Sequence, residues 1–251
     1  MTTLTEKCVI KFACAWSAMV LLIGGCGTTG NVKASDVYAD PQVVALAEAA
    51  ARGDARRVAR LAAEGVDVDA RGDKKTSLLE WALLNRSKAG LAALLDAGAD
   101  PAVTDEQGNS VVHLAAMSND PDYLRILLDK GADPNTPNDK TGATPIFSAL
   151  MGTRDEQLQM LLTAGADPAR ADRMGNTPLH LAAKINAFAR TLDLLEAGAP
   201  PEARNQLGTT FQWCFFQTPE HLLTEKARRE RAAVVDWLRR HDIAVEGPTA
   251  L

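Results

Sequence analysis

The chain has 251 residues, of which 46% are apolar and 24% charged, and its formal net charge is −5. This length allows one large domain or two small ones, and the abundance of alanine, leucine and glycine favours helices joined by tight turns. Because the balance is acidic and no long basic block occurs, the composition argues against a nucleic-acid partner.

Residues 1–25 are expected to form a signal peptide that is removed from the mature protein. Lys7 and Lys11 make a modest positive region, and residues 12–25 form an uncharged stretch of 14 residues. That stretch is too short to span a bilayer comfortably as a helix. It ends in LLIGGC, and its last four residues, 23–26, resemble the lipobox of bacterial lipoproteins position by position. An ordinary apolar signal that happens to contain a cysteine is the alternative.

The resemblance to lipoproteins implies that Cys26 becomes the N-terminus and carries three acyl chains. One chain anchors a protein only marginally, whereas two or more hold it firmly, so the lipid would be the protein's one membrane contact. Gly27 follows the cysteine, in place of the aspartate that commonly retains lipoproteins in the inner membrane. The expected location is therefore the outer membrane, facing the periplasm. Residues 26–39 have little apolar content and no helical periodicity, so we expect a flexible tether there.

Two independent markers then recur with one period between residues 40 and 246. The first, seen in AGAD, places glycines at positions 65, 98, 131, 165 and 198, with spacings of 33, 33, 34 and 33 residues. The second, seen in GNTPLHLAA, places glycines at 108, 142, 175 and 208, with spacings of 34, 33 and 33 residues. A period of this length indicates a repeat array, in which each unit buries its apolar face against its neighbours.

The repeat unit resembles the ankyrin repeat. The closest copy is GNTPLHLAAKINAFARTLDLLEAGA, in which Thr177, Pro178, Leu179, His180 and Ala182 stand at the signature positions. The resemblance implies an all-α ankyrin-repeat solenoid of helix-turn-helix units with hairpin fingers, comprising about five full repeats and an irregular C-terminal capping unit. The residue chemistry agrees, because Thr177 can cap a helix that Pro178 begins. A glycine after the second helix tolerates the left-handed conformation that ends it.

Several units depart from this pattern. The first unit lacks an ordinary finger and signature, as expected for an end unit that faces water on one side. Trp81 stands where leucine is usual, Val111 takes the proline position, and Phe147 takes the histidine position. We expect these units to fold with altered packing.

Residue types that could carry chemistry are explained by the repeat. His113 and His180 occupy the signature position, where ankyrin repeats use the ring for a structural hydrogen bond. Aspartates recur once per unit, at Asp67, Asp100, Asp133 and Asp167. Their repetition favours turn chemistry over a catalytic pair. The sequence contains no glycine-rich phosphate loop, nucleophile elbow or metal-ligand spacing, so we expect no enzyme, no cofactor and no metal.

The resemblance implies a protein-binding module, since ankyrin arrays bind proteins along a concave surface of finger tips and first-helix faces. The candidate contacts are finger residues that the repeat does not dictate. They are Arg71, Lys74, Glu106, Gln107, Lys140, Arg173, Met174, Gln206 and Leu207. Met174 and Leu207 carry the most weight, because exposed apolar residues cost solubility. Each candidate also has a simpler interpretation as a solvated turn residue, and we expect a monomer in the absence of a partner.

The last unit, from about residue 205, contains an insertion. The distance from the signature threonine to the terminal position is 31 residues, from Thr210 to His241, instead of 21 in the preceding unit, so ten residues have been added. Thr218 as a cap and Pro219 as the first helical residue predict one helix over 219–240, of roughly 33 Å, whose first half projects.

The segment FQWCFF, residues 211–216, opens this unit and is expected to pack against the fifth unit. These features favour a C-terminal cap. A partner-contact edge that includes Arg228 and Arg229 is the alternative, because aromatic residues and arginine are common in binding hot spots. Residues 247–251 are interpreted as a tail.

Two classes of function are compatible with these features. The first is a lipid-anchored periplasmic protein that binds one partner, in its sharpest form an immunity protein that neutralises a toxin such as a secreted phospholipase effector. The acidic chain would suit a basic face on such a toxin. The second is a housekeeping envelope scaffold or stress-protection protein with several partners. A hydrolase is a remote third.

Overall fold

The computed structural model describes residues 32–246. The predicted signal peptide, the lipidation site Cys26, residues 26–31 of the predicted tether and the predicted tail at 247–251 lie outside these residues. The fold described below belongs to the compact unit that begins at Ala34.

Residues 32–246 form helices, with no β-strand and two isolated β-bridges, Arg71–Ser77 and Thr104–Ser110. Six successive units are α3 (Pro41–Arg52) with α4 (Ala55–Ala63), α5 (Leu78–Leu84) with α6 (Lys88–Asp96), α7 (Val111–Met117) with α8 (Asp122–Asp129), α9 (Pro145–Met151) with α10 (Asp155–Thr163), α11 (Pro178–Lys184) with α12 (Phe188–Glu196), and α13 (Phe211–Phe215) with α14 (Glu225–Arg240). Three short helices, α2 (Ala34–Val37) and the 3₁₀ helices η2 (Asp73–Lys75) and η3 (Glu220–Leu222), complete this part of the chain. None of these helices is long and apolar enough to cross a membrane.

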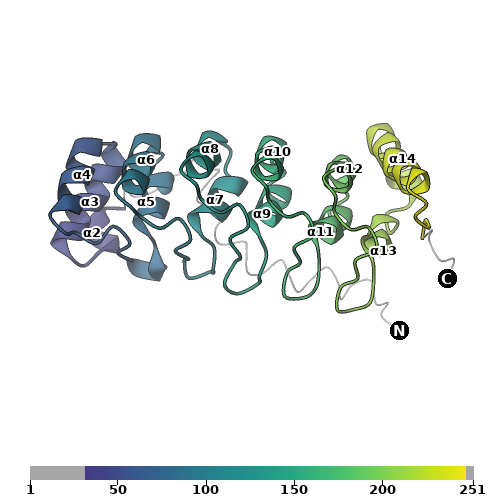
Figure 1. Ribbon diagram of the computed structural model, residues 1–251, viewed down its shortest axis with the longest axis horizontal. Coiled ribbons are helices and arrows are strands. Elements are labelled where there is room, and N and C mark those ends of the chain that lie inside the picture. Colours follow the sequence, from purple (N-terminus) through teal and green to yellow (C-terminus); the bar gives the residue numbers. More distant parts are fainter. Residues whose placement is uncertain (1–31, 247–251) are drawn as a thin grey trace. The chain divides into compact units, whose positions relative to one another are not determined.

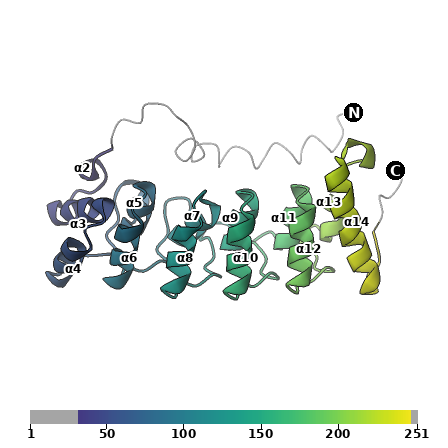
Figure 2. The same ribbon diagram turned by 90° about the horizontal axis from the view of Figure 1, so that it is seen from above.

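The helices are arranged in two rows (Figure 2). Each first helix packs on the next first helix, from α3 through α5, α7, α9 and α11 to α13, and second helices pack likewise from α4 to α6 to α8 and from α12 to α14. Leucines and alanines that are completely buried fill the space between the rows, such as Leu94, Leu124, Leu158 and Leu194. The segments that join one unit to the next all extend to the same side of the rows (Figure 1). We call these segments, residues 70–77, 104–110, 137–144, 171–177 and 204–210, the fingers.

Local residue chemistry accounts for the helix ends. In the fifth unit, Thr177 is the N-cap of α11 and Pro178 is its first residue, as predicted. The glycines of the first marker all have left-handed φ angles, between +84° and +92°, which glycine adopts without strain. The repeated aspartates accept hydrogen bonds from the backbone two residues later, for example Asp100 from the Ala102 amide at 2.8 Å. These aspartates therefore have the predicted turn role.

The N-terminal end of the folded part lies earlier than the sequence indicated. Residues 34–38 lie in the predicted flexible tether, but they form α2 and the buried residue Tyr38. The Tyr38 hydroxyl donates to the Ser77 carbonyl at 3.1 Å, and its ring meets the Trp81 ring edge-on at a centroid distance of 6.0 Å. The Trp81 indole in turn donates to the Ala47 carbonyl. The unusual Trp81 therefore packs with an added N-terminal segment, which covers the first units.

The C-terminal unit differs from its prediction in one respect. The predicted helix over 219–240 is wrong in its first turns, because Pro219 is extended, η3 follows it, and α14 begins only at Glu225 with Thr224 as its N-cap. At 16 residues α14 is still longer than the other second helices, which have 8 or 9. The inserted segment is held against α14, since Arg231 donates to the Thr218 carbonyl at 2.8 Å.

The aromatic segment of this unit forms α13 and packs on α11, as predicted. Phe211 and Phe215 are completely buried, and the Phe215 ring meets those of Phe188, Phe211 and Phe216 edge-on. Residues 244–246 run back along the start of α13, where the Gln212 side chain binds both the Ala244 carbonyl and the Glu246 amide.

Candidate protein-interaction surface

Each finger after the first is built around an aspartate or asparagine at its base. In the fourth finger, Asp172 accepts hydrogen bonds from the amides of Met174 and Asn176, at 2.9 and 2.8 Å. The Asp172 amide also donates to the Asn176 carbonyl, closing the turn. The residues with the same role in the other fingers are Asp105, Asn138 and Asn205. This bonding fixes the direction of each finger tip.

Backbone hydrogen bonds also join neighbouring fingers. Each of the last four fingers donates one amide to a carbonyl of the preceding finger: Glu106 to Lys74, Asp139 to Gly108, Arg173 to Thr141 and Gln206 to Met174, at 2.7–3.0 Å. The finger tips therefore form one connected edge and not five independent loops.

All nine predicted finger residues are exposed on this edge. Two of them have a second, structural role, because the Arg173 guanidinium donates to the Asp139 carbonyl and the Gln206 amide donates to the Arg173 carbonyl. The apolar pair stands out, with Met174 49% and Leu207 78% exposed. These two residues occupy the same place in consecutive fingers, directly before the finger glycine, so they present adjacent apolar tips.

The two candidates in the last unit do not join this edge. Arg228 and Arg229 are exposed on α14, in the row of second helices (Figure 1). The Arg228 guanidinium donates to the Leu223 carbonyl, and Arg229 pairs with Glu225 one turn earlier at 3.8 Å. The structure thus separates these arginines from the finger candidates.

Sequence reasoning missed a second set of exposed apolar residues, at the ends of the first helices. Leu84 is 41% and Met151 45% exposed, and Met117 is half-buried. Each lies seven residues after the capping serine or threonine of its unit, where the fifth and sixth units have Lys184 and Gln217. The sequence could have revealed these residues through this shared position, because it places an apolar residue at the same point of α5, α7 and α9.

Exposed charges on the fingers are mainly positive. Six cations, Arg71, Lys74, Lys75, Lys140, Arg173 and Arg204, accompany three exposed anions, Asp73, Glu106 and Asp139. The chain as a whole is acidic, so its negative charge lies elsewhere. The sequence-based expectation that the array suits a basic face is therefore wrong for the finger edge, where acidic groups on a partner would be attracted.

The signature histidines have the predicted structural role. The His113 Nδ1 atom accepts from the Ser110 amide, and Nε2 donates to the Ala143 carbonyl of the next finger at 3.0 Å. Burial lowers the pKa of His113 to about 4, and burial also lowers the pKa of His180, which makes the equivalent bonds. Both rings are therefore neutral near pH 7, and they link each helix to the next finger.

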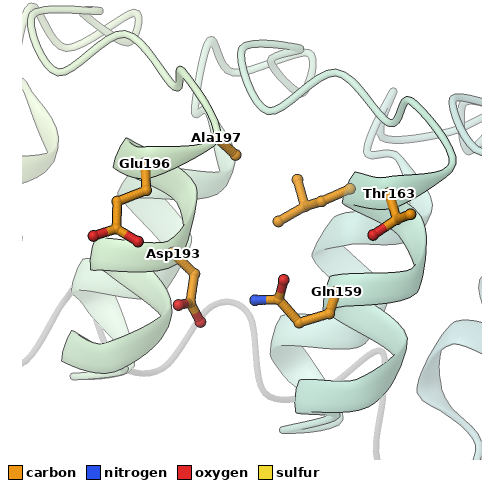
Figure 3. A pocket seen from close by; sticks show the side chains of 6 residues that line it. Gln159, Thr163, Asp193, Glu196 and Ala197 are labelled. Atoms are coloured by element: carbon orange, nitrogen blue, oxygen red, sulfur yellow. The ribbon is translucent and has the colours of Figure 1, made fainter.

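One open pocket of about 330 Å³ lies between α10 and α12, in the row of second helices. Its lining residues are Gln159, Leu162, Thr163, Asp193, Glu196 and Ala197. Figure 3 shows the Asp193 and Gln159 side chains pointing toward each other across it. Burial, with the nearby Glu196 charge second, raises the pKa of Asp193. The pocket is small and polar, and it lies away from the fingers, so the finger edge is the stronger candidate site.

Residues 46–138, 88–172 and 112–205 match the family described as "Ankyrin repeats (3 copies)". A solved structure, the ankyrin repeat protein EF0377, is similar with a TM-score of 0.62 at 21% sequence identity, covering 76% of this chain and 96% of that chain. At this identity the likeness concerns the fold alone. No curated protein sequence matches the chain.

Proposed function

The chain belongs to the ankyrin-repeat family, and we propose that it binds one partner protein through its finger edge and the adjoining ends of its first helices. The observation that carries this proposal is the set of apolar side chains exposed there, Met174 and Leu207 on the fingers and Leu84 and Met151 on the helices. The repeat does not require apolar residues at these positions, since Gln107 and Lys184 stand at equivalent ones. Burial in an interface would recover the free energy lost by exposing them.

The surface also suggests the chemistry of the partner. Exposed cations outnumber exposed anions on the fingers, so the matching face would combine apolar side chains with carboxylates. The apolar side chains would supply most of the affinity, and the charges would speed association and favour the correct orientation.

For location, we propose an outer-membrane lipoprotein that faces the periplasm, anchored by acyl chains on Cys26. The support is the LLIGGC pattern and the glycine that follows it. Metabolic labelling with a radioactive fatty acid tests this proposal: the full chain should incorporate label and Cys26→Ser should not. Label retained by Cys26→Ser would contradict it.

In this compartment we propose that the protein is an immunity protein, which neutralises a toxin delivered into the envelope, such as a secreted phospholipase. The support is the combination of the proposed membrane anchor with the proposed binding edge, since a membrane-active toxin would meet the anchored array at its site of action. Cells that produce the full chain should survive the toxin, and cells that produce a finger-edge variant should not. Equal survival without the protein would contradict this role.

The binding edge itself can be tested by capture. The mature chain with Cys26→Ser is used as bait beside a double variant, Met174→Glu with Leu207→Glu, in the producing bacterium's envelope fraction. One stoichiometric protein should bind the parent and be lost from the double variant. A matched control is Leu222→Glu, because Leu222 is 67% exposed but lies in η3, outside the fingers. Equal capture by parent and double variant would refute the proposed edge, and a spread of weakly bound envelope proteins would favour a housekeeping scaffold.

A further inference from the structure

The fourth unit, α9 with α10, and the fifth unit, α11 with α12, are joined less closely than the other neighbouring units. In the third unit, Nε2 of His113 donates to the Ala143 carbonyl at the start of α9. In the fifth unit, Nε2 of His180 donates to the Thr209 carbonyl at the start of α13. The fourth unit has Phe147 at this position, and a phenyl ring cannot donate such a bond. The link from α9 to the start of α11 is therefore missing.

The loops that follow the second helices lack another link at the same boundary. Between the third and fourth units, the Asn135 side chain accepts a hydrogen bond from the Asp167 amide at 2.7 Å. Ala169 and Pro200 stand at the equivalent positions between the fourth and fifth units. Alanine has no side-chain acceptor and proline has no amide N–H, so this hydrogen bond cannot form there.

The row of second helices opens around α10. Whereas α4, α6 and α8 pack on one another, and α12 packs on α14, α10 packs closely on neither α8 nor α12. On the α8 side, hydrogen bonds compensate at the start of α10. Arg154 donates to the Met117 carbonyl at 3.0 Å, and Gln157 donates to the Ser118 carbonyl at 2.7 Å. The fourth unit is therefore held to the third by bonds that do not depend on helix packing.

On the α12 side, polar side chains span an open space. The pocket of about 330 Å³ lies between α10 and α12. Asp155 pairs with Arg190 across this boundary, and the Gln159 side chain faces the Asp193 carboxyl group (Figure 3). Long polar side chains can rotate to follow a moving partner, and ion pairs with an exposed member contribute little free energy. These contacts therefore resist a change of the distance between the two helices only weakly.

The fingers beside this boundary remain joined. The Arg173 amide donates to the Thr141 carbonyl at 2.7 Å, and the Arg173 guanidinium donates to the Asp139 carbonyl at 2.6 Å. A backbone bond of this length fixes the two fingers more closely than the side-chain contacts fix the second helices. A rotation between the fourth and fifth units would therefore have its axis near the fingers and its largest displacement at α10 and α12.

We propose that the boundary between the fourth and fifth units is a hinge, about which the first four units and the last two rotate to change the curvature of the array. Hinges lie where few interactions oppose a motion between two better-packed parts. Met151 lies on one side of the hinge and Leu207 on the other, so rotation changes the separation of these exposed apolar residues. The array would thereby adjust its surface to a bound protein. The hinge belongs to the free chain, and its test needs no partner.

Double electron–electron resonance on the mature chain with Cys26→Ser and Cys214→Ser tests the hinge. Spin labels are attached to cysteines that replace exposed residues at the ends of α4, α8 and α12. The hinge pair, Asp129→Cys with Glu196→Cys, spans two unit boundaries that include the hinge. The control pair, Ala63→Cys with Asp129→Cys, spans two boundaries that exclude it. The distance distribution of the hinge pair should be the broader one, and equal widths would overturn the proposal.

Variants that rebuild the missing links locate the motion. Ala169→Asn with Pro200→Asp copies the loop residues found between the third and fourth units. Phe147→His restores the ring donor and offers a partner to the Thr144 hydroxyl, which is buried without one among the described residues. Both variants should narrow the distribution of the hinge pair. The control Ala102→Asn makes the same loop change between the second and third units and should leave the width unaltered.

The loop variant decides the outcome, because its two positions are not buried and the substitutions leave the packed core intact. If it folds with an unchanged width, or if Ala102→Asn narrows the distribution equally, the motion is not at this boundary and the proposal is overturned. Phe147→His adds an independent reading, since it acts from the first helix and not from the loops.

Discussion

The aromatic centre of the last unit offers the sharpest test of how the array is closed. Phe215 is completely buried, and its ring meets three others edge-on: Phe188 of the fifth unit at 5.1 Å, Phe211 at 5.7 Å and Phe216 at 5.1 Å. Truncating a buried phenylalanine to alanine costs about 3–5 kcal/mol, and each edge-on pair adds about 0.5–1.5 kcal/mol beyond its buried area. Since neighbouring contributions overlap, we expect Phe215→Ala to lose about 4 kcal/mol.

The matched control is Trp213→Ala, two residues away in the same helix. Trp213 is 51% exposed, so its removal should cost less than about 1 kcal/mol. Repeat arrays can unfold from one end. Amide hydrogen exchange reports the stability of each helix separately, whereas a single spectroscopic unfolding curve reports the whole array. Protection should fall first in α13 and α14 for Phe215→Ala, with α5 to α8 unchanged. Equal effects of the two substitutions, or uniform loss of protection along the array, would refute the interpretation of this unit as a packed cap.

Three further predictions concern other joints of the array. Burial lowers the pKa of His113 to about 4. The parent should therefore lose stability relative to His113→Gln as the pH falls from 6.5 toward 4. If the urea midpoints of the two proteins differ by the same amount throughout this range, the ring is not a neutral structural group. A Cβ atom on Gly90 would lie 1.8 Å from the Ala50 carbonyl oxygen. Gly90→Ala should therefore lower the free energy of unfolding by about 1–3 kcal/mol, measured by thermal or urea unfolding. The control Ala89→Ser, at the exposed neighbouring position, should lower it by about 0.5 kcal/mol or less. Tyr38→Phe removes the bond to the Ser77 carbonyl and should cost about 0.5–1.5 kcal/mol in the same assay, and no effect would mean that α2 does not stabilise the array.

Much of the fold could be predicted because its determinants are local. Glycines with left-handed φ angles, aspartates that close turns and Thr-Pro helix starts act within a few residues, so their spacing alone predicts the unit and its period. The sequence-based prediction fails where contacts between residues far apart in the chain determine the local structure. The helix at residues 34–37 is too short to show periodicity, and Tyr38 is buried by Trp81, which lies 43 positions later.

The start of α14 shows the same limit. Thr218 with Pro219 and Thr224 with Glu225 are both acceptable helix starts by local rules. The second is used because the inserted segment folds back on α14, where Arg231 holds the Thr218 carbonyl and lies 3.9 Å from Glu220. A contact of this kind has no signature in the local sequence.

The candidate surface was predicted only in part. Finger tips could be identified because the repeat fixes most other positions, and all nine are exposed. Leu84 and Met151 were missed because the sequence pattern predicts that apolar residues at the end of a buried helix belong to the core. Their exposure depends on how far the next unit extends over each helix end, which only the packed array defines. The positive charge of the fingers was hidden for a similar reason, by the acidic total of the chain.

Hydroxyl-radical footprinting of the captured complex would test the central claim most directly. Methionine, leucine and tryptophan side chains report their own exposure, and the chain carries such residues both on and away from the proposed edge. On binding, Met174, Leu207 and Met151 should become protected, while Leu222 and Trp213 should react as in the free protein. Protection of Leu222 and Trp213, with the finger residues unchanged, would contradict the claim and place the partner on the C-terminal unit.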